Sequence, residues 1–261
     1  MEIVIAPDPL AAADIAADAI ARLLNTNPNP VLGLATGSSP IPIYDNLIER
    51  FQNGALSFAT CRAFLLDEYV GLAADHPEAY RSYIRRLFTD HIDLPPGALF
   101  GPDGYAADLS NAAMEYERLI TEAGGIDLQI LGIGGDGHIG FNEPASSLGS
   151  RTRLKTLNEA TRRDNARFFD HDINAVPHHV LTQGIGTILD AGHLILIATG
   201  ESKALPVARA VEGPLTAMVP ASALQLHPHV TIVLDEPAAQ DLSQIEYYRE
   251  AYANKPQWQH I

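Results

Sequence analysis

The sequence predicts an α/β protein with a doubly wound, mostly parallel central sheet and helices on both faces. Short apolar runs alternate with amphipathic segments along the 261 residues, without an internal repeat or a clear linker. Several apolar runs end in glycine, serine or acidic residues, as strands do at the carboxyl edge of such a sheet. We therefore expect one domain over residues 1–261, with an active-site lid at about residues 157–180.

The expected elements follow one another in the order strand, then helix. Runs of β-branched and other apolar residues predict strands at residues 3–6, 31–35, 61–66, 128–133, 194–198 and 230–234. Apolar residues at helical spacing predict helices at residues 10–24, 40–48, 76–88 and 106–123, and one through 207–211. Residues 145–190 are less regular.

Composition excludes several classes of function. A formal net charge of -15 without a basic stripe argues against nucleic-acid and anionic-membrane partners. No run reaches the roughly 18 apolar residues that a membrane span requires. The first residues, MEIVIAPDPL, lack the basic start of a signal peptide. Cys61 is the only cysteine, which fits a reducing compartment, so we expect a cytoplasmic protein.

The richest chemistry lies in residues 131–144, LGIGGDGHIGFNEP, which follow an apolar run. Asp136, His138 and Glu143 lie close enough in sequence to share a site there. Flanking carboxylates make a histidine a more basic, oriented proton carrier. No serine or cysteine adjoins His138 and no nucleophile elbow is present, so acyl-enzyme chemistry is not favoured.

Three further segments end predicted strands with polar residues. Asp67 and Glu68 are read either as catalytic carboxylates or as a helix cap, and the cap is favoured for Glu68. The loop at residues 36–40, which contains Gly37, Ser38 and Ser39, suits an anion as well as it suits an ordinary capped turn. Lys203 opposes the dipole at a helix start and therefore suits a bound anion.

The irregular segment contains six basic residues, Arg151, Arg153, Lys155, Arg162, Arg163 and Arg167. A solvated surface explains most of them, and a few are candidates for binding phosphate. A metal site at His171, His178 and His179 is discounted, because their spacing matches no common zinc pattern and no cysteine joins them.

Together, His138 and Asp67 suit a reaction that opens a ring and moves a proton between neighbouring carbons.

Four motifs closely resemble the glucosamine-6-phosphate deaminase family: LGLATGSSP at 32–40, LDEYVGL at 66–72, GDGHIGFNEPASSLGSRTR at 135–153, and GESKA at 200–204. The resemblance implies conversion of glucosamine 6-phosphate into fructose 6-phosphate and ammonia, without a redox cofactor or a required metal. Asp67 would be the general base. His138 would open the sugar ring with help from Asp136 and Glu143. The 6-phosphate would lie among Gly37, Ser38, Ser39, Arg167 and Lys203.

The resemblance also implies a homo-oligomer, with a hexamer favoured, and activation by N-acetylglucosamine 6-phosphate. Ser146, Ser147, Arg153 and Lys155 match the activator's phosphate site, whereas residues 246–261 depart from the family pattern. Two alternative functions stay open. The first is a 6-phosphogluconolactonase, although the residues after His138 favour the deaminase. The second is a non-catalytic sugar-phosphate sensor, for which this acidic chain has no DNA-binding module.

Overall fold

The structure is a computed structural model that describes residues 1–73, 75–256 and 258–261. Within these ranges, seven strands form one sheet in the spatial order β1-β10-β9-β6-β2-β3-β5. All of their pairings are parallel. The strands are β1 (Glu2–Ala6), β2 (Val31–Leu34), β3 (Arg62–Leu65), β5 (Leu99–Phe100), β6 (Leu128–Leu131), β9 (His193–Ala198) and β10 (Val230–Asp235).

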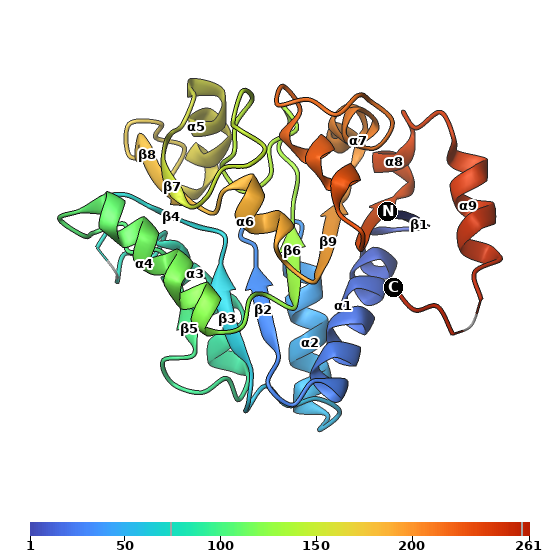
Figure 1. Ribbon diagram of the computed structural model, residues 1–261, viewed down its shortest axis with the longest axis horizontal. Helices are drawn as coiled ribbons and strands as arrows, with labels where there is room; N and C mark the ends of the chain where they lie inside the picture. The colour runs from blue at the N-terminus through green and yellow to red at the C-terminus, as the bar shows by residue number, and fades with distance from the viewer. Residues whose placement is uncertain (74, 257) are drawn as a thin grey trace.

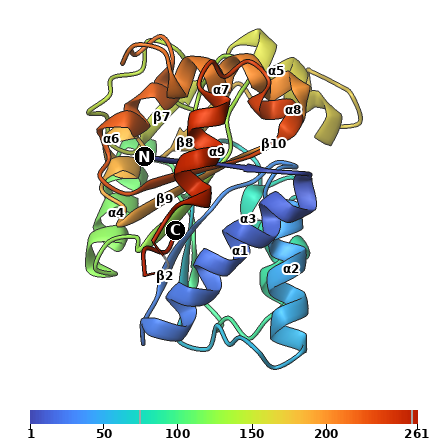
Figure 2. The same ribbon diagram turned by 90° about the vertical axis from the view of Figure 1, so that its right-hand side faces the viewer.

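Helices surround this sheet, which confirms the predicted fold class. Figure 1 gives their order, and Figure 2 shows α1 and α2 on one side of the sheet with α4 and α6 on the other. The α-helices are α1 (Pro9–Thr26), α2 (Ile41–Gln52), α3 (Tyr80–Leu87), α4 (Leu109–Glu122), α5 (Glu159–Asn165), α6 (Ile185–Leu189), α7 (Ala204–Val211), α8 (Glu236–Ala239) and α9 (Ile245–Ala253). Short 3-10 helices are η1 (Thr89–His91), η2 (Ala166–Phe168), η3 (Glu201–Lys203) and η4 (Pro220–Leu226).

The order of the strands places the site. Within the large sheet, the strand that follows β2 along the chain is β3, whereas the strand that follows β6 is β9, on the other side of the β2–β6 pair. The loops that leave the carboxyl ends of β2 and β6 therefore diverge and open a crevice between them. Ligands bind at this switch point in open α/β sheets, and residues 36–40 and 132–141 are the loops that border it.

A second, small sheet was not predicted. Among the described residues, β4 (Asp67–Tyr69), β8 (His179–Thr182) and β7 (Arg153–Thr156) form an antiparallel sheet in the order β4-β8-β7. β4 has only three residues, and its partner strand lies more than 100 positions further along the chain. Neither feature leaves a periodic pattern in the sequence. Asp67 thus begins a new strand rather than ending the strand predicted at 61–66.

Side-chain caps move two helix starts from their predicted positions. α3 begins at Tyr80 rather than near His76, because the Glu68 carboxylate accepts hydrogen bonds from the backbone N–H groups of Tyr80 at 2.8 Å and Arg81 at 3.0 Å. α4 begins at Leu109 because Asp108 accepts a hydrogen bond from the Asn111 N–H at 2.9 Å. The interpretation of Glu68 as a helix cap is confirmed.

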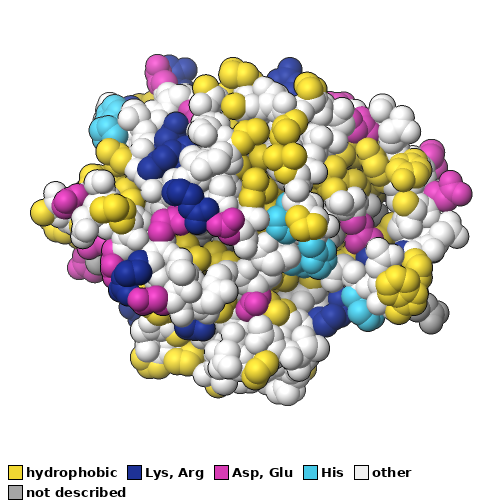
Figure 3. All heavy atoms as spheres, viewed as in Figure 1, with side chains coloured by type: hydrophobic (Ala, Val, Ile, Leu, Met, Phe, Trp, Pro, Cys, Tyr) yellow, Lys and Arg dark blue, Asp and Glu magenta, His cyan; other side chains and the backbone are white. Residues whose placement is uncertain are grey.

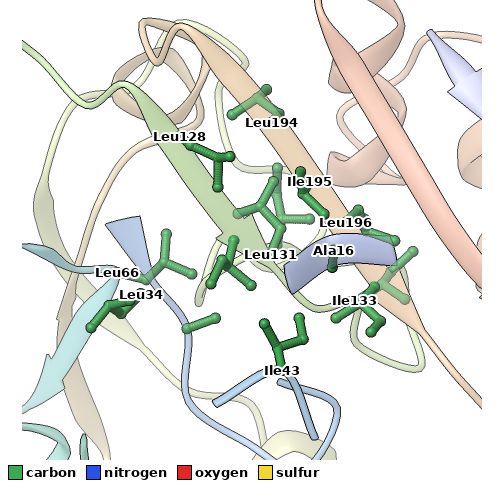
Figure 4. Close-up of a cluster of buried hydrophobic side chains, with 14 of the residues drawn as sticks. Ala16, Leu34, Ile43, Leu66, Leu128, Leu131, Ile133, Leu194, Ile195 and Leu196 are labelled. Carbon is green, nitrogen blue, oxygen red and sulfur yellow. The ribbon is translucent and has the colours of Figure 1, made fainter. Parts of the chain in front are cut away.

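The core beneath the site lies between the middle strands and the first two helices. Figure 4 shows Leu34 of β2, Leu131 of β6 and Leu196 of β9 close to Ala16 of α1 and Ile43 of α2. All five are at most 1% exposed. Alanines on the buried face of α1 bring that helix close to the sheet. This packing gives the loops at the carboxyl edge a rigid base.

The C-terminal helix α9 packs along β1 at the edge of the sheet (Figure 2). Near it, Lys255 forms an ion pair with Glu2 at 2.7 Å, and Arg22 donates a hydrogen bond to the Ile261 carbonyl at 2.9 Å. The tail is thereby attached to the N-terminal strand and helix. Among the described helices, none combines the length and the apolar character needed to cross a bilayer.

Candidate active site

A cavity of about 530 Å³ opens at the carboxyl edge of the sheet. The loops after β2, β6 and β9 form its floor, and residues of β4, α3, α5 and η2 complete its wall. Seven residues singled out from the sequence line it: Gly37, Ser38, Ser39, Asp67, His138, Arg167 and Lys203. The structure therefore brings one proton-transfer half and one anion-binding half, predicted from separate segments, to the same cavity.

The loop after β6 is shaped around His138. The Gly134 N–H donates a hydrogen bond to the His138 carbonyl at 2.9 Å, which closes a tight turn. A side chain at Gly134 would place its Cβ 2.2 Å from the His138 ring, so any residue other than glycine would displace the imidazole. Gly137, at the turn's tip, has a φ of +87°. These constraints explain why glycine stands at positions 134 and 137.

Asp136 contacts the imidazole of His138. Its Oδ1 lies 2.7 Å from Nδ1 of the ring and accepts a hydrogen bond from the His138 backbone N–H at 3.1 Å. Partial burial opposes ionisation of Asp136, but the contacts with His138 outweigh it, so the pKa of this carboxyl is lowered. A carboxylate at Nδ1 favours the tautomer that leaves Nε2 as a proton acceptor.

Glu143 is buried and faces the lid. Its Oε1 accepts a hydrogen bond from the Asn158 N–H at 3.2 Å, and its Oε2 accepts a second from the Asn158 side chain. Asn158 in turn caps α5 by accepting from the Thr161 N–H at 2.8 Å. In the part of the chain that the structure describes, the side-chain hydrogen bonds of Glu143 run to Asn158, so its support of His138 stays a prediction.

Asp67 is a buried carboxyl in the cavity wall, and the residue is 4% exposed. Burial raises the pKa of Asp67 well above its ordinary value, and the neighbouring Glu68 adds to the effect. Glu68 itself is occupied by backbone N–H groups, including that of Tyr69 at 2.9 Å. A carboxyl that is costly to ionise is a strong base once it has lost its proton.

Two basic side chains, Arg167 and Lys203, also line the cavity. Lys203 donates a hydrogen bond from Nζ to the Ile133 carbonyl at 2.7 Å, and burial followed by the charge of Arg167 lowers its pKa. The Arg167 guanidinium lies 4.8 Å from the Phe168 ring centroid. Gly37 has a φ of +93° and turns the chain into α2. A phosphate dianion between these groups would relieve the mutual repulsion of the two cations.

Three tyrosines in the wall were missed from the sequence. Tyr69, Tyr80 and Tyr83 line the cavity, and the sequence places Tyr80 and Tyr83 only within the helix expected at residues 76–88. The Tyr69 hydroxyl accepts a hydrogen bond from the Asn165 side chain in the lid at 3.0 Å, and its ring lies 4.7 Å from that of Tyr80. Helical spacing identifies a buried face but does not distinguish a core from a cavity wall.

The four predicted activator-site residues lie apart from the cavity lining. Arg153 donates from Nη1 to the Asn142 side chain at 2.9 Å, and burial lowers its pKa. Burial, followed by the charge of Arg153, also lowers the pKa of Lys155. Ser147 is exposed, whereas Ser146 is 3% exposed and its hydroxyl has no hydrogen-bond partner among the described residues. Their role stays a prediction.

Most of the remaining basic side chains in this region neutralise acids. Arg151 pairs with Glu117 at 2.7 Å and with Asp190 at 2.6 Å, and Arg163 pairs with Glu159 at 2.5 Å. Basic and acidic side chains lie next to one another on the face seen in Figure 3. Within the described ranges, no three His, Cys, Asp or Glu side chains are grouped as a metal site would require.

Comparison with known proteins shows the family. Residues 9–233 match the family described as glucosamine-6-phosphate isomerases/6-phosphogluconolactonase. The chain is 58% identical over 261 residues to a glucosamine-6-phosphate deaminase of Mycolicibacterium smegmatis, covering 100% of both chains. It is 57% identical over 261 residues to a glucosamine-6-phosphate deaminase of Streptomyces avermitilis, again covering 100% of both.

Solved structures agree with this assignment. A protein described as a monomeric glucosamine-6-phosphate deaminase superposes with a TM-score of 0.90 at 43% identity, covering 92% of this chain and 100% of its own. A 6-phosphogluconolactonase from Trypanosoma brucei, at 20% identity and a TM-score of 0.76, shares the fold over 93% of this chain and 98% of its own. By sequence and by structure, the chain belongs to the family of glucosamine-6-phosphate isomerases and 6-phosphogluconolactonases.

Proposed function

We propose that this chain isomerises and deaminates glucosamine 6-phosphate, releasing fructose 6-phosphate and ammonia. One observation carries the proposal: a buried carboxyl, Asp67, and an imidazole in contact with a carboxylate, His138, line one cavity together with Arg167 and Lys203. The full-length relatives that are more than half identical bear the name of a deaminase, which supports the same activity here.

Each half of the cavity has a chemical task. His138 moves a proton from the C1 hydroxyl to the ring oxygen, which opens the pyranose. Asp67 takes the proton from C2 and delivers it to C1, while a proton passes from the C2 amino group to O1, which leaves an alcohol at C1 and an imine at C2. Water hydrolyses that imine, so C2 becomes the ketone and its nitrogen leaves as ammonia. Asp136 keeps Nε2 of His138 available, and Glu143 is proposed to support the same histidine.

The phosphate anchors the substrate to the cationic residues of the cavity. We assign its oxygens to the N–H groups and hydroxyls of the loop with Gly37, Ser38 and Ser39, and to Arg167 and Lys203. Charge-assisted bonds of this kind are stronger than neutral ones. Binding energy from this remote group then holds C1 and C2 beside Asp67. No redox cofactor or metal takes part in the proposed steps.

The decisive experiment incubates the folded protein with glucosamine 6-phosphate and measures fructose 6-phosphate and ammonia in equal amounts. Folded protein that forms neither product refutes the proposal. Hydrolysis of 6-phosphogluconolactone above its spontaneous rate would establish the lactonase instead. Ligand binding without turnover of either compound would establish a sugar-phosphate sensor. Asp241→Asn, an exposed carboxyl far from the cavity lining, is the control for Asp67→Asn.

Regulation and assembly extend the proposal. We infer that N-acetylglucosamine 6-phosphate binds at Ser146, Ser147, Arg153 and Lys155. Two observations support this: the Ser146 hydroxyl has no partner in the described part of the chain, and Arg153 is partly buried. We further propose one domain with a lid at about residues 157–180, a homo-oligomer with a hexamer favoured, and a cytoplasmic location. Light scattering on the purified protein tests the assembly, and a mass equal to one chain of 28.1 kDa contradicts the hexamer.

A further inference from the structure

Thr182 lies between the two proton-transfer groups. It is the last residue of β8, is fully buried, and pairs in register with Asp67 of β4. Its Oγ1 accepts a hydrogen bond from the Phe141 N–H at 3.1 Å, in the loop that contains His138. We propose that Thr182 is a positioning residue that holds the His138 loop at a set distance from Asp67. The inference rests on the proposed function.

The residue after Thr182 reinforces the same connection. The Gln183 N–H donates to the Leu66 carbonyl at 2.8 Å, and its side chain donates to the Leu65 carbonyl at 3.1 Å. On the other side, the Asn142 side chain donates to the Gln183 carbonyl at 2.8 Å and to the Ile139 carbonyl at 2.9 Å. Residues 182–183 are therefore bonded both to the segment before Asp67 and to the His138 loop.

The packing around Gly140 leaves little freedom for the loop to slide. A Cβ at Gly140 would lie 3.0 Å from the Thr182 Oγ1 and 3.6 Å from the Asp67 Oδ2. The backbone next to His138 thus passes directly against both Thr182 and the catalytic carboxylate. Proton transfer depends on separations of a few tenths of an ångström, so a small displacement of this loop lowers the rate.

The hydroxyl of Thr182, rather than its methyl group, makes this connection. A buried backbone N–H requires an acceptor, and for Phe141 that acceptor is the Thr182 Oγ1. Valine has nearly the same shape as threonine but offers no acceptor. In Thr182→Val the Phe141 N–H must find another partner, and the loop shifts to reach it. Thr182→Ser retains the acceptor and restores the connection.

Steady-state kinetics with glucosamine 6-phosphate test the proposal. Thr182→Val is expected to lower kcat by ~10- to 100-fold while KM stays within about twofold, because Thr182 acts on the geometry of the reacting groups and not on phosphate binding. Thr182→Ser is expected to retain kcat within about threefold. The matched control is Thr231→Val: Thr231 is equally buried in a strand, and its Oγ1 lies 2.9 Å from the His193 Nε2, away from the cavity.

A kcat of Thr182→Val equal to that of the wild type overturns the proposal, as does an equal loss in Thr231→Val. NMR signals of the His138 ring give a readout that does not need turnover. They are expected to move in Thr182→Val and to stay in place in Thr182→Ser and Thr231→Val. Unmoved signals overturn the positioning role even where the wild type is inactive, whereas moved signals with an inactive wild type refute only the proposed function.

Discussion

Asp67 and Arg153 pair in register with the same residue, Thr182, from opposite sides of the small sheet. Arg153 also donates a hydrogen bond to the side chain of Asn142, which in turn bonds the Ile139 carbonyl beside His138. Arg153, which matches the predicted activator site, therefore lies two strands from the proposed base, Asp67. The side chain of Asn142 connects it to the His138 loop. An anion that bound Nη1 of Arg153 would compete with the Asn142 side chain for that donor.

Replacing Arg153 by glutamine is expected to abolish activation. The variant loses the guanidinium that would bind the activator phosphate, so the ratio of rates with and without N-acetylglucosamine 6-phosphate falls to about one. Arg163→Gln, which removes a surface ion pair with Glu159, is the control. Initial rates at subsaturating substrate measure the effect. Activation that persists in Arg153→Gln refutes the assigned activator site.

Replacing Asp67 by asparagine is expected to lower kcat by about 10²- to 10⁴-fold, since the general base is lost. In the wild type, the rate should fall as pH drops through the raised pKa of Asp67, so the acid limb lies above the ordinary value of 3.8. A pH–rate profile for kcat/KM locates that limb. An acid limb at or below the ordinary value would show that another group limits the rate.

The same substitution is expected to stabilise the fold at neutral pH. The folded-state pKa of Asp67 is raised, so protonated Asp67 contributes to the stability of the folded state. This contribution is fully present below the unfolded-state pKa and is lost as pH rises through the folded-state pKa. Asp67→Asn stays neutral and avoids burying a charge. A gain on the order of 1 kcal/mol, or roughly 2–4 °C in Tm, is expected at pH 8 and should vanish near pH 4. Thermal melts at both pH values check this, and a gain independent of pH contradicts it.

Replacing Lys203 by methionine is expected to raise KM more than it lowers kcat. Loss of a charge-assisted bond to phosphate costs about 1.5–3 kcal/mol, which corresponds to roughly 10- to 100-fold in KM. Lys255→Met, which breaks the ion pair with Glu2 at the tail, is the control. Inorganic phosphate should inhibit the wild type and lose this effect in Lys203→Met. A KM equal to that of the wild type would remove Lys203 from the phosphate site.

The lid is expected to gain protection when ligand binds. Arg167 is exposed and, within the described ranges, forms no ion pair, so phosphate would supply the partner that orders it. Hydrogen exchange over residues 158–179 should slow with a substrate analogue. Asn158→Ala removes the cap of α5 and should lower the free energy of local opening there by about 1 kcal/mol, which speeds exchange by the corresponding factor. Equal exchange with and without the analogue contradicts the lid.

Much of the fold followed from local chemistry. Fully buried runs such as residues 194–198, and helical spacing such as that of residues 10–24, are properties of adjacent residues, and they placed strands and helices in the right order. The contact between Asp136 and His138 was also predictable locally, because the two residues lie two positions apart. Starts of helices were less certain, since Glu68 caps α3 from another element.

The sequence by itself determined the α/β order, the family resemblance and seven of the residues that line the cavity, because each depends on short-range periodicity or on contiguous motifs. Only the tertiary structure decided that Glu143 faces Asn158, that tyrosines form the cavity wall, and that Thr182 stands between Asp67 and Arg153. These relationships join residues 15 to more than 100 positions apart, and pairings at such separations leave no signal in either segment alone.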